Sequence, residues 1–102
     1  MDIFKYADVS TKHITAKDND ILDRLKRSDN FPMTVANYEY GYFIALPELE
    51  TFRKYGEKDR LIEHGMSEAF CHLIEMAIKK KCTILRLDRD GWDCKGLKEF
   101  EW

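Results

Sequence analysis

Changes in the spacing of hydrophobic residues divide the chain into expected elements. Between Met66 and Ile78 the apolar side chains recur at steps of three and four, which is the spacing of one face of a helix. Ser67 can cap this segment, and the lysines at 79–81 end it where the helix dipole favours cations. The pattern therefore predicts an amphipathic helix, the most regular one of the chain.

A shorter apolar stripe predicts another helix in the first third of the chain. Thr15 and Asp18 have the spacing of a capping box, and further carboxylates follow in the early turns. The stripe ends near Leu25, and the run "SDNFP" interrupts any helix beyond it. We therefore expect this helix over about residues 16 to 28.

Two-residue alternation and aromatic or β-branched residues mark the strands. The strongest such segment, "MTVANYEYGYFIALP", predicts a β-hairpin that turns at residues 39–41. The segment "DVSTKHI" predicts a short strand near the N-terminus, and "CTILRL" predicts one after the amphipathic helix. These segments supply four strands.

Two remaining segments have weaker patterns. Residues 48–64 are mostly polar and predict an irregular link with a short helix that Gly56 ends. The tail "CKGLKEFEW" alternates less regularly and predicts either a last strand or an extension docked on the domain.

The order of the expected elements is strand, helix, hairpin, link, helix and strand, followed by the tail. We predict an α+β fold in which a mostly antiparallel sheet of four to five strands carries two helices on one face, since that arrangement buries both helical stripes. The same element order occurs in ferredoxin-like domains. No repeat or internal linker divides the chain, so we expect residues 1–102 to form a single globular domain.

Composition and charge narrow the function. A chain of 102 residues with 44% hydrophobic and 13% aromatic residues suits one core. The 19 acidic and 17 basic residues give a formal charge of −2, which disfavours general binding to nucleic acids. No apolar run is long enough to span a membrane, and the N-terminus lacks the apolar region of a signal peptide. We therefore expect a cytoplasmic protein without a membrane partner.

The three cysteines, Cys71, Cys82 and Cys94, are an odd number with wide spacings. They fit neither a disulfide framework nor paired zinc-binding motifs. We expect reduced thiols.

The segment "LRLDRDGWD" is the first candidate for chemistry, because it places three aspartates within six residues beside a glycine. An EF-hand loop would need a ligand where Trp92 stands, so the calcium pattern fails. A turn is the simpler interpretation, in which Asp88 closes an Asx turn and Gly91 supplies a positive φ. Asp88 and Asp90 stay as alternative residues for a metal site or a small metal-dependent enzyme.

The second candidate is the segment "HGMSEAFCH". Glu68 and His72 share a helix face at i, i+4 and could bind a metal, although the spacing is not that of an HExxH motif. His64 precedes the helix, and neighbouring Cys71 and His72 point about 100° apart on it, so these two form no nucleophile and base pair by themselves. An exposed Glu–His pair is the simpler interpretation. We predict no metal and no cofactor.

His13 and the aromatic hairpin are the remaining candidates. His13 lies beside hydroxyl residues that also cap helices and strand ends, which disfavours a catalytic role. The hairpin carries Tyr38, Tyr40, Tyr42 and Phe43. RNA-recognition motifs place stacking aromatics on such a strand, but "EYGYFIAL" lacks the basic residue and the second stacking aromatic of that motif. A tyrosine-rich outer surface is instead suited to a protein partner.

Three segments resemble one known family. "STKHIT", "YGYFIALP", and "LDRDG" followed by "LKEFEW" are similar to an uncharacterised family of short plasmid, prophage and phage accessory proteins. Its members resemble this chain in ending on a Leu-Asp-x-Asp-Gly turn, a short tail and a terminal tryptophan. The family is a domain of unknown function, so the resemblance implies mobile-element origin and assigns no catalytic residue.

These observations favour a non-enzymatic phage or mobile-element accessory protein that binds a protein partner through Tyr38, Tyr40 and Tyr42. The partner would be a host or defence factor. A counter-defence inhibitor of the anti-CRISPR kind is the most specific form of this hypothesis, by analogy with other small proteins of mobile elements.

Two alternatives stay open. A nucleic-acid-binding ferredoxin-like module would use the lysines at 79–81, or Arg24 and Arg27, and its binding would weaken steeply with salt. A small metal-dependent enzyme would use the turn at Asp88 and Asp90.

Overall fold

The computed structural model describes residues 1–102, which form one mixed four-stranded sheet with helices. The strands are β1 (Tyr6–Ser10), β2 (Val35–Tyr38), β3 (Gly41–Ala45) and β4 (Ile84–Asp88). The α-helices are α1 (Ala16–Asp23), α2 (Leu49–Lys54), α3 (Glu57–Glu63) and α4 (Glu68–Lys79). Two short 3-10 helices are η1 (Thr11–His13) and η2 (Arg27–Asp29). The predicted α+β class is confirmed.

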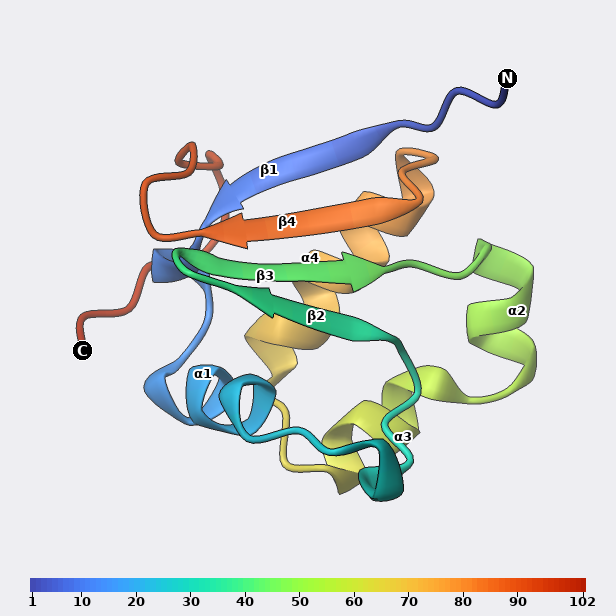
Figure 1. Ribbon diagram of the computed structural model, residues 1–102, viewed down its shortest axis with the longest axis horizontal. Helices are drawn as coiled ribbons and strands as arrows, with labels where there is room; N and C mark the ends of the chain where they lie inside the picture. The colour runs from blue at the N-terminus through green and yellow to red at the C-terminus, as the bar shows by residue number, and fades with distance from the viewer.

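The sheet has the strand order β1-β4-β3-β2 (Figure 1). β4 pairs with β3 and β3 with β2 in antiparallel fashion, whereas β1 pairs with β4 in parallel. The elements follow one another as in a ferredoxin-like domain, but the sheet differs, because β4 lies between β1 and β3 and runs parallel to β1. β1 and β2 are the two edge strands.

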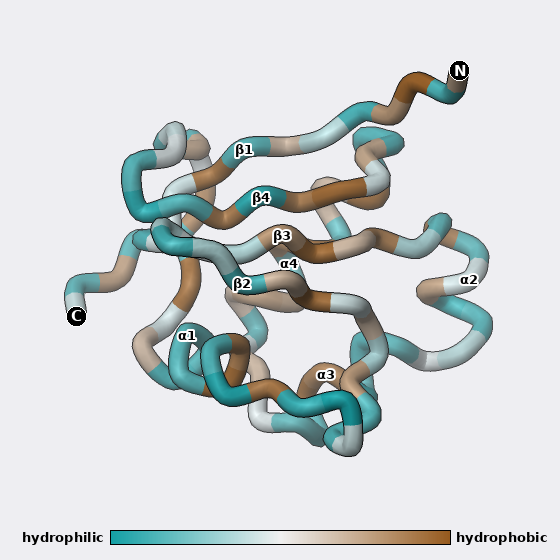
Figure 2. Tube along the Cα trace, viewed as in Figure 1, coloured by the Kyte–Doolittle hydropathy of each residue, from teal (hydrophilic) through white to brown (hydrophobic).

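The helices cover one face of the sheet and leave the other bare. In Figure 1, α4 crosses behind the sheet and α1 and α3 lie below it, while no element lies in front. Hydrophobic residues concentrate along β3 and β4 in Figure 2, and a single cluster of 19 buried residues joins these strands to α4. No helix has the length and hydrophobicity that a membrane span needs.

The predicted capping box of α1 is present and does more than cap that helix. Thr15 Oγ1 accepts the Asp18 N–H at 3.0 Å, and the Asp18 carboxylate accepts the Thr15 N–H at 3.0 Å. The buried Asp18 carboxylate also accepts the Ser67 N–H at 2.8 Å and the Ser67 hydroxyl at 2.6 Å. One carboxylate therefore joins the N-termini of α1 and α4.

α1 ends at Asp23, five residues before the predicted end at 28. The following segment is polar and turns through η2, and Asn30 adopts a positive φ of 54°. It has too few apolar residues to bury another helical turn.

The amphipathic helix and the hairpin form where they are predicted. Ser67 Oγ accepts the Phe70 N–H at 3.1 Å at the start of α4, and Lys81 adopts a positive φ of 67° just beyond its end. In the hairpin, Tyr38 pairs with Gly41 around a two-residue turn. Both elements depend on contacts between residues close in sequence, which local patterns describe well.

The first strand begins and ends earlier than predicted. β1 ends at Ser10, where the expected strand continued to residue 14. Ser10 Oγ accepts the Lys12 N–H at 3.2 Å, and this cap begins η1 in place of further strand.

The link between the hairpin and α4 contains two helices where one was predicted. Gly56 follows α2 as expected, but its positive φ of 58° lets the chain begin α3 at once. The buried Phe52 and Leu61 attach α2 and α3 to the core. With one strongly buried apolar residue each, these helices give no clear periodic signal in the sequence.

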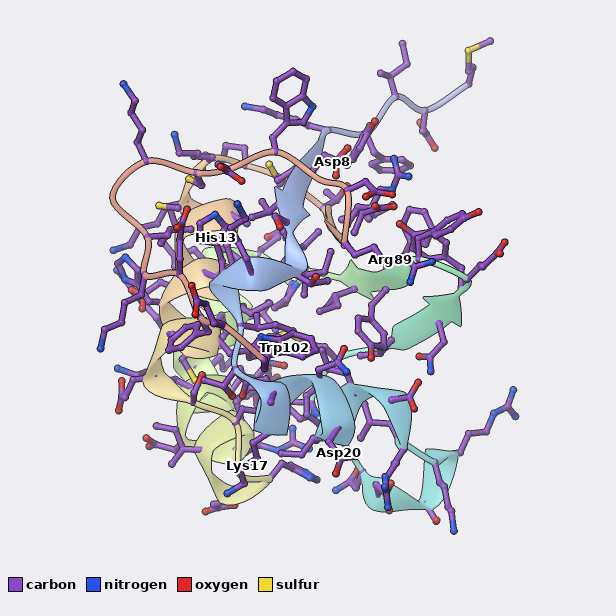
Figure 3. The ribbon with its side chains drawn as sticks, turned by 90° about the vertical axis from the view of Figure 1, so that its left-hand side faces the viewer. Asp8, His13, Lys17, Asp20, Arg89 and Trp102 are labelled. Carbon is purple, nitrogen blue, oxygen red and sulfur yellow. The ribbon has the colours of Figure 1, made fainter.

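The C-terminal tail, residues 89–102, docks on the domain without forming a strand. The Phe100 N–H donates to the Lys12 carbonyl at 2.7 Å, and the Trp102 indole N–H donates to the Ile14 carbonyl at 3.0 Å. Figure 3 shows Trp102 between η1 and the beginning of α1. Of the two predicted alternatives, the docked extension is confirmed.

Candidate functional site

The face of the sheet that points away from the helices carries the candidate site, and we call it the open face. Side chains alternate between the two faces along each strand, so the pairing register identifies its members. They form three rows across the sheet: Tyr6, Ile84 and Ala45; then Asp8, Arg86, Phe43 and Ala36; then Ser10, Asp88, Gly41 and Tyr38.

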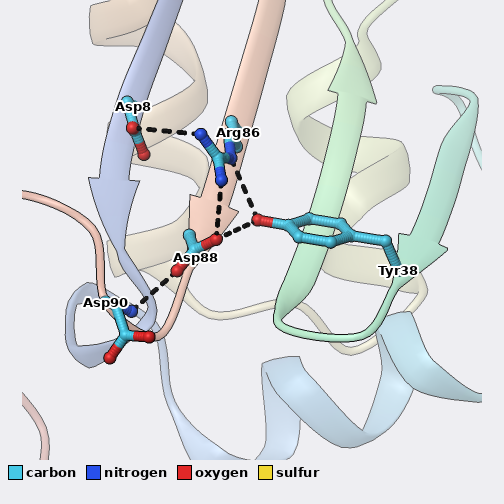
Figure 4. A network of polar contacts seen from close by, with 5 residues as sticks. All are labelled: Asp8, Tyr38, Arg86, Asp88 and Asp90. Carbon is cyan, nitrogen blue, oxygen red and sulfur yellow. Dashed lines mark hydrogen bonds and ion pairs between the residues drawn. The ribbon is translucent and has the colours of Figure 1, made fainter.

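Arg86 lies at the centre of the open face and is bound on three sides (Figure 4). Its Nε donates to the Tyr38 hydroxyl at 3.0 Å, its Nη2 donates to Asp88 Oδ2 at 3.0 Å, and its Nη1 lies 3.5 Å from Asp8 Oδ2. The Tyr38 hydroxyl in turn donates to Asp88 Oδ2. The other Asp8 oxygen, Oδ1, is buried without a hydrogen-bond partner. Two carboxylates therefore face one guanidinium.

Tyr38 reaches Asp88 by crossing β3 at a position that has no side chain. Tyr38 pairs with Gly41 of β3, and Gly41 pairs with Asp88 of β4. A Cβ at Gly41 would lie 1.8 Å from the Leu87 carbonyl oxygen, so only glycine fits there. The glycine also leaves the outer surface of β3 free, and the Tyr38 ring occupies it.

The contacts around Arg86 shift the acidity of the groups involved. The hydrogen bonds from the Tyr38 hydroxyl and the Asp90 N–H, helped by the Arg86 guanidinium, hold the pKa of Asp88 below its ordinary value. Burial and the hydrogen bond to Asp88 raise the pKa of Tyr38. The hydrogen bond with Tyr38 and the two carboxylates raise the pKa of Arg86. At neutral pH the cluster therefore holds a cation, an anionic Asp88 and a neutral phenol.

Aromatic side chains surround this charged cluster. The Tyr38 and Phe43 rings lie 4.9 Å apart, and the Arg86 guanidinium is 5.6 Å from the first ring centre and 5.9 Å from the second. Tyr40 meets Tyr38 edge to face, and the Arg89 guanidinium lies 4.9 Å from the Tyr40 ring centre. Phe43 and Tyr40 are 40% and 42% exposed, so the rings are available to a partner.

Tyr42 does not belong to this surface, which corrects its prediction as a partner-binding residue. Its side chain points toward the helices and is 4% exposed. Its hydroxyl donates to Asn19 Oδ1 at 2.8 Å, and burial raises its pKa to about 12. The two-residue turn of the hairpin places Tyr38 and Tyr42 on opposite faces, so Tyr42 belongs to the core.

The aspartates of "LRLDRDGWD" form a turn and the end of the charged cluster. The Asp90 N–H donates to Asp88 Oδ1 at 2.7 Å, which is the predicted Asx turn. The predicted positive φ of Gly91 is wrong, because its backbone is not in the left-handed region. Glycine is needed there for another reason: a Cβ would lie 2.7 Å from the carbonyl of Val9.

The candidate metal ligands do not assemble. No group of three or more His, Cys, Asp or Glu side chains is placed to bind a metal ion. Both Asp88 oxygens accept hydrogen bonds from within the domain, and Glu68 pairs with Lys58 at 3.7 Å. His72 lies with Glu68 on the wall of a groove beside the tail. Burial raises the pKa of the neighbouring Cys71 thiol to about 11, which makes it a weak nucleophile.

His13 anchors the C-terminal tail. Its Nε2 accepts the Cys94 N–H at 2.9 Å, so Nδ1 carries the proton and donates to the Lys98 carbonyl at 2.9 Å. The ring is 2% exposed. A buried histidine with both nitrogens engaged has a structural task here, and neither Ser10 nor Thr11 bonds to it.

The basic residues considered for nucleic-acid binding lie at helix ends and are partly neutralised. Lys79 pairs with Glu75 at 3.2 Å, and Arg24 pairs with Asp20 at 2.8 Å. Both pairs have the i, i+4 spacing of exposed helical ion pairs, which reduce the local positive charge.

The predicted contact residues omitted three members of the site, Asp8, Phe43 and Arg86, although Phe43 was recognised as part of the aromatic hairpin. The sequence does indicate the position of Arg86, because the alternation in "CTILRL" places its side chain on the other face of β4 from the buried leucines. Nothing local indicates that Asp8, 78 residues away, meets it.

Comparison with known proteins identifies a family without assigning a function. Residues 6–102 match a family model described as a family of unknown function (DUF5983), C-terminal domain. No curated protein and no solved structure matches the chain.

Proposed function

The chain belongs to this family of unknown function, and we propose that it is a non-enzymatic protein-binding domain whose contact surface is the open face of the sheet. One observation supports this proposal above the others. Tyr38 and Phe43 lie against an arginine that already has its counter-charges, Tyr40 packs on Tyr38, and no helix or strand lies in front of this face in Figure 1.

The chemistry of this surface favours a protein over a nucleic acid. Aromatic residues and arginine are enriched at the centres of protein interfaces. A phosphate that approached Arg86 would also approach the carboxylates of Asp8 and Asp88. Because those carboxylates offset the charge of the guanidinium in advance, a protein surface can cover it at a smaller electrostatic cost than it could cover a lone cation.

We further propose that the partner is a host or defence factor and that the protein acts as a phage or mobile-element accessory protein. The resemblance of the segments "STKHIT", "YGYFIALP" and "LDRDG" to such proteins motivates this part of the proposal. A counter-defence inhibitor of the anti-CRISPR kind is its most specific form, and it rests on analogy among small mobile-element proteins.

The test is capture of partners from a bacterial lysate by the tagged domain, quantified by mass spectrometry. The double variant Tyr40→Ala with Phe43→Ala removes an exposed ring of the open face and the exposed ring of the adjacent hairpin turn. Tyr55→Ala is the matched control, because Tyr55 is 62% exposed and lies at the end of α2. We expect one dominant protein, recovered equally with and without EDTA, that the control retains and the double variant loses.

Other results would contradict the proposal in distinguishable ways. Equal recovery by the double variant and by Tyr55→Ala would exclude the open face as the contact surface. Recovery that disappears after nuclease treatment would favour the nucleic-acid alternative. Recovery that disappears with EDTA would return attention to the carboxylates of Asp88 and Asp90.

A further inference from the structure

The outer edge of β1 has free backbone hydrogen-bonding groups. β1 is the first strand in the sheet order, and β4 is its only neighbour. The Ser10 N–H donates to the Trp92 carbonyl at 3.0 Å, which closes the C-terminal end of this edge. No other backbone hydrogen bond outside the sheet ladder involves residues 6–10. Figure 1 shows the rest of the outer edge of β1 without a neighbouring element.

The direction of the free groups follows from two hydrogen bonds. The Lys5 carbonyl accepts the Thr83 N–H at 2.9 Å and therefore points toward β4, whereas Ser10 points its N–H away from β4. In an extended chain successive residues point their N–H and C=O to alternate sides. Tyr6 and Asp8 therefore direct their backbone groups outward, where a further strand could pair with both.

Two of the features that commonly protect an edge strand, a proline and a bulge, are absent from β1, and the tail covers this edge only at Ser10. Proline, a bulge or a covering loop commonly prevents pairing with other chains. β1 contains no proline, and its register with β4 is unbroken from Tyr6 to Ser10. Tyr6, the first residue of β1, is 57% exposed, and two apolar residues of the segment that leads into the strand, Ile3 and Phe4, are 90% and 66% exposed.

The charges of the open face specify what the pairing strand should carry. Two carboxylates, Asp8 and Asp88, face the single guanidinium of Arg86, so the cluster formally carries one negative charge in excess, and the Asp8 side chain is 26% exposed. Asp8 is the member of the cluster on the edge strand. In an antiparallel pair, the residue opposite Asp8 would share its face at a Cα separation of about 5.5 Å.

We infer that β1 binds an extended segment of the partner protein as an antiparallel fifth strand, with a lysine or arginine opposite Asp8 and an apolar residue opposite Tyr6. Main-chain hydrogen bonds to Tyr6 and Asp8 supply the docking, and the cation completes the charge balance around Asp8. From its N-terminus, the recognised segment then has the sequence pattern of a basic residue, any residue and an apolar residue. This inference rests on the proposed protein-binding function and gives the chemistry of its partner.

The experiment selects binders from a displayed library of random ten-residue peptides with the full chain as bait. The selected peptides are then measured against two variants of one residue. Tyr6→Pro removes the outward N–H at the first position of an edge strand, where proline is tolerated. Tyr6→Ala removes the ring and keeps the N–H. We expect enrichment of the basic-x-apolar pattern, with affinity about tenfold lower in Tyr6→Pro than in Tyr6→Ala.

Two further measurements separate backbone pairing from charge. Hydrogen exchange at the amides of Tyr6 and Asp8 should slow when a selected peptide binds. Asp8→Asn keeps the size of the side chain and removes its charge, so it should abolish the preference for a basic residue while Tyr6 amide protection persists. Circular dichroism of every variant checks that the sheet is intact.

Three results would overturn the inference. These are peptides enriched without a basic position, equal affinity of Tyr6→Pro and Tyr6→Ala, and a dimer of the free chain that Tyr6→Pro dissociates, which would make a second copy the occupant of this edge. If peptide binding fails while the lysate partner still depends on Tyr40 and Phe43, the edge inference is wrong and the protein-binding proposal stands.

Discussion

The two faces of the sheet are formed by the same strands but carry different kinds of side chain. On the helix side, Ile44, Leu85 and Leu87 are fully buried and stabilise the fold through the apolar area they remove from water. On the open side, Phe43 keeps 40% of its area exposed, and the Arg86 side chain keeps 33%. The contacts there are polar and aromatic, and solvent screens them.

The difference teaches that a two-residue period gives one strand a face that stabilises the core and a face that carries the charged and aromatic cluster. Along β4, Leu85 and Leu87 pack on the helices while Arg86, between them, belongs to the charged cluster. In the hairpin, Tyr38 and Tyr42 are the same residue type, but the turn places Tyr38 on the open face and Tyr42 in the core. A side chain can therefore change on the open face with little effect on the core.

The largest expected effect comes from truncating the helix side. Leu87→Ala leaves a cavity beneath the sheet and should lower the free energy of unfolding by about 2–5 kcal/mol. Urea denaturation measures this loss. Phe43→Ala, on the opposite face of the neighbouring strand, is the control and should lower stability by only about 1 kcal/mol, because the ring is partly exposed. Equal losses in the two variants would contradict the separation of the two faces.

A smaller but still clear loss should follow Gly41→Ala. The new Cβ would meet the Leu87 carbonyl oxygen, so β3 and β4 must move apart, at a cost of about 1–3 kcal/mol. Because the shift moves β3 under the Tyr38 ring, it should also disturb the Arg86 cluster. Gly96→Ala is a useful comparison, since Gly96 has open space around it and only its positive φ of 87° opposes the change. Urea denaturation, with near-ultraviolet circular dichroism for the tyrosines, distinguishes the two.

The smallest effect is a change in acid stability after Tyr38→Phe. The pKa of Asp88 is lowered in the folded protein, so the stability it contributes is present above its unfolded pKa and is lost as pH falls through the folded value. Removing the Tyr38 hydroxyl removes the largest cause of that lowering. The stability of Tyr38→Phe should therefore fall less steeply than wild type below about pH 4.

Urea midpoints between neutral and acidic pH test this expectation. Asp88→Asn should likewise make stability depend less on pH in the acidic range. Combining it with Tyr38→Phe should change this dependence little further, because both substitutions act on one titrating group. If the stability of Tyr38→Phe falls as steeply at acidic pH as that of wild type, the Tyr38 hydroxyl is not the main cause of the lowered Asp88 pKa.

Much of the fold could be predicted because its elements are specified locally. α4 and the hairpin follow from spacing, caps and turn residues within a few positions of one another. The α+β class and the helix-covered sheet follow from the order of those elements. α3 was not predicted because Leu61 is its only fully buried apolar residue. α1 ends earlier than predicted because the segment that follows it is polar and has few apolar side chains to bury.

The candidate site was predicted only in part, for a reason of distance along the chain. The sequence pattern identifies the hairpin tyrosines as candidates. In the structure, however, Tyr42 belongs to the core, and Arg86 lies at the centre of the open face. Asp8 and Arg86 are 78 residues apart, and Tyr38 and Asp88 are 50 apart. No spacing rule relates residues so distant.

The sequence by itself determined the alternation that gives each strand a buried and an exposed face and the caps that begin α1 and α4. Only the tertiary structure decided which charges meet, since strand order brings β1 beside β4 and thereby Asp8 beside Arg86. The same holds for Asp18, which reaches Ser67 across 49 residues, and for His13, which joins the tail across 81. Local patterns follow from the geometry of neighbouring residues, whereas these contacts exist only after the sheet has assembled.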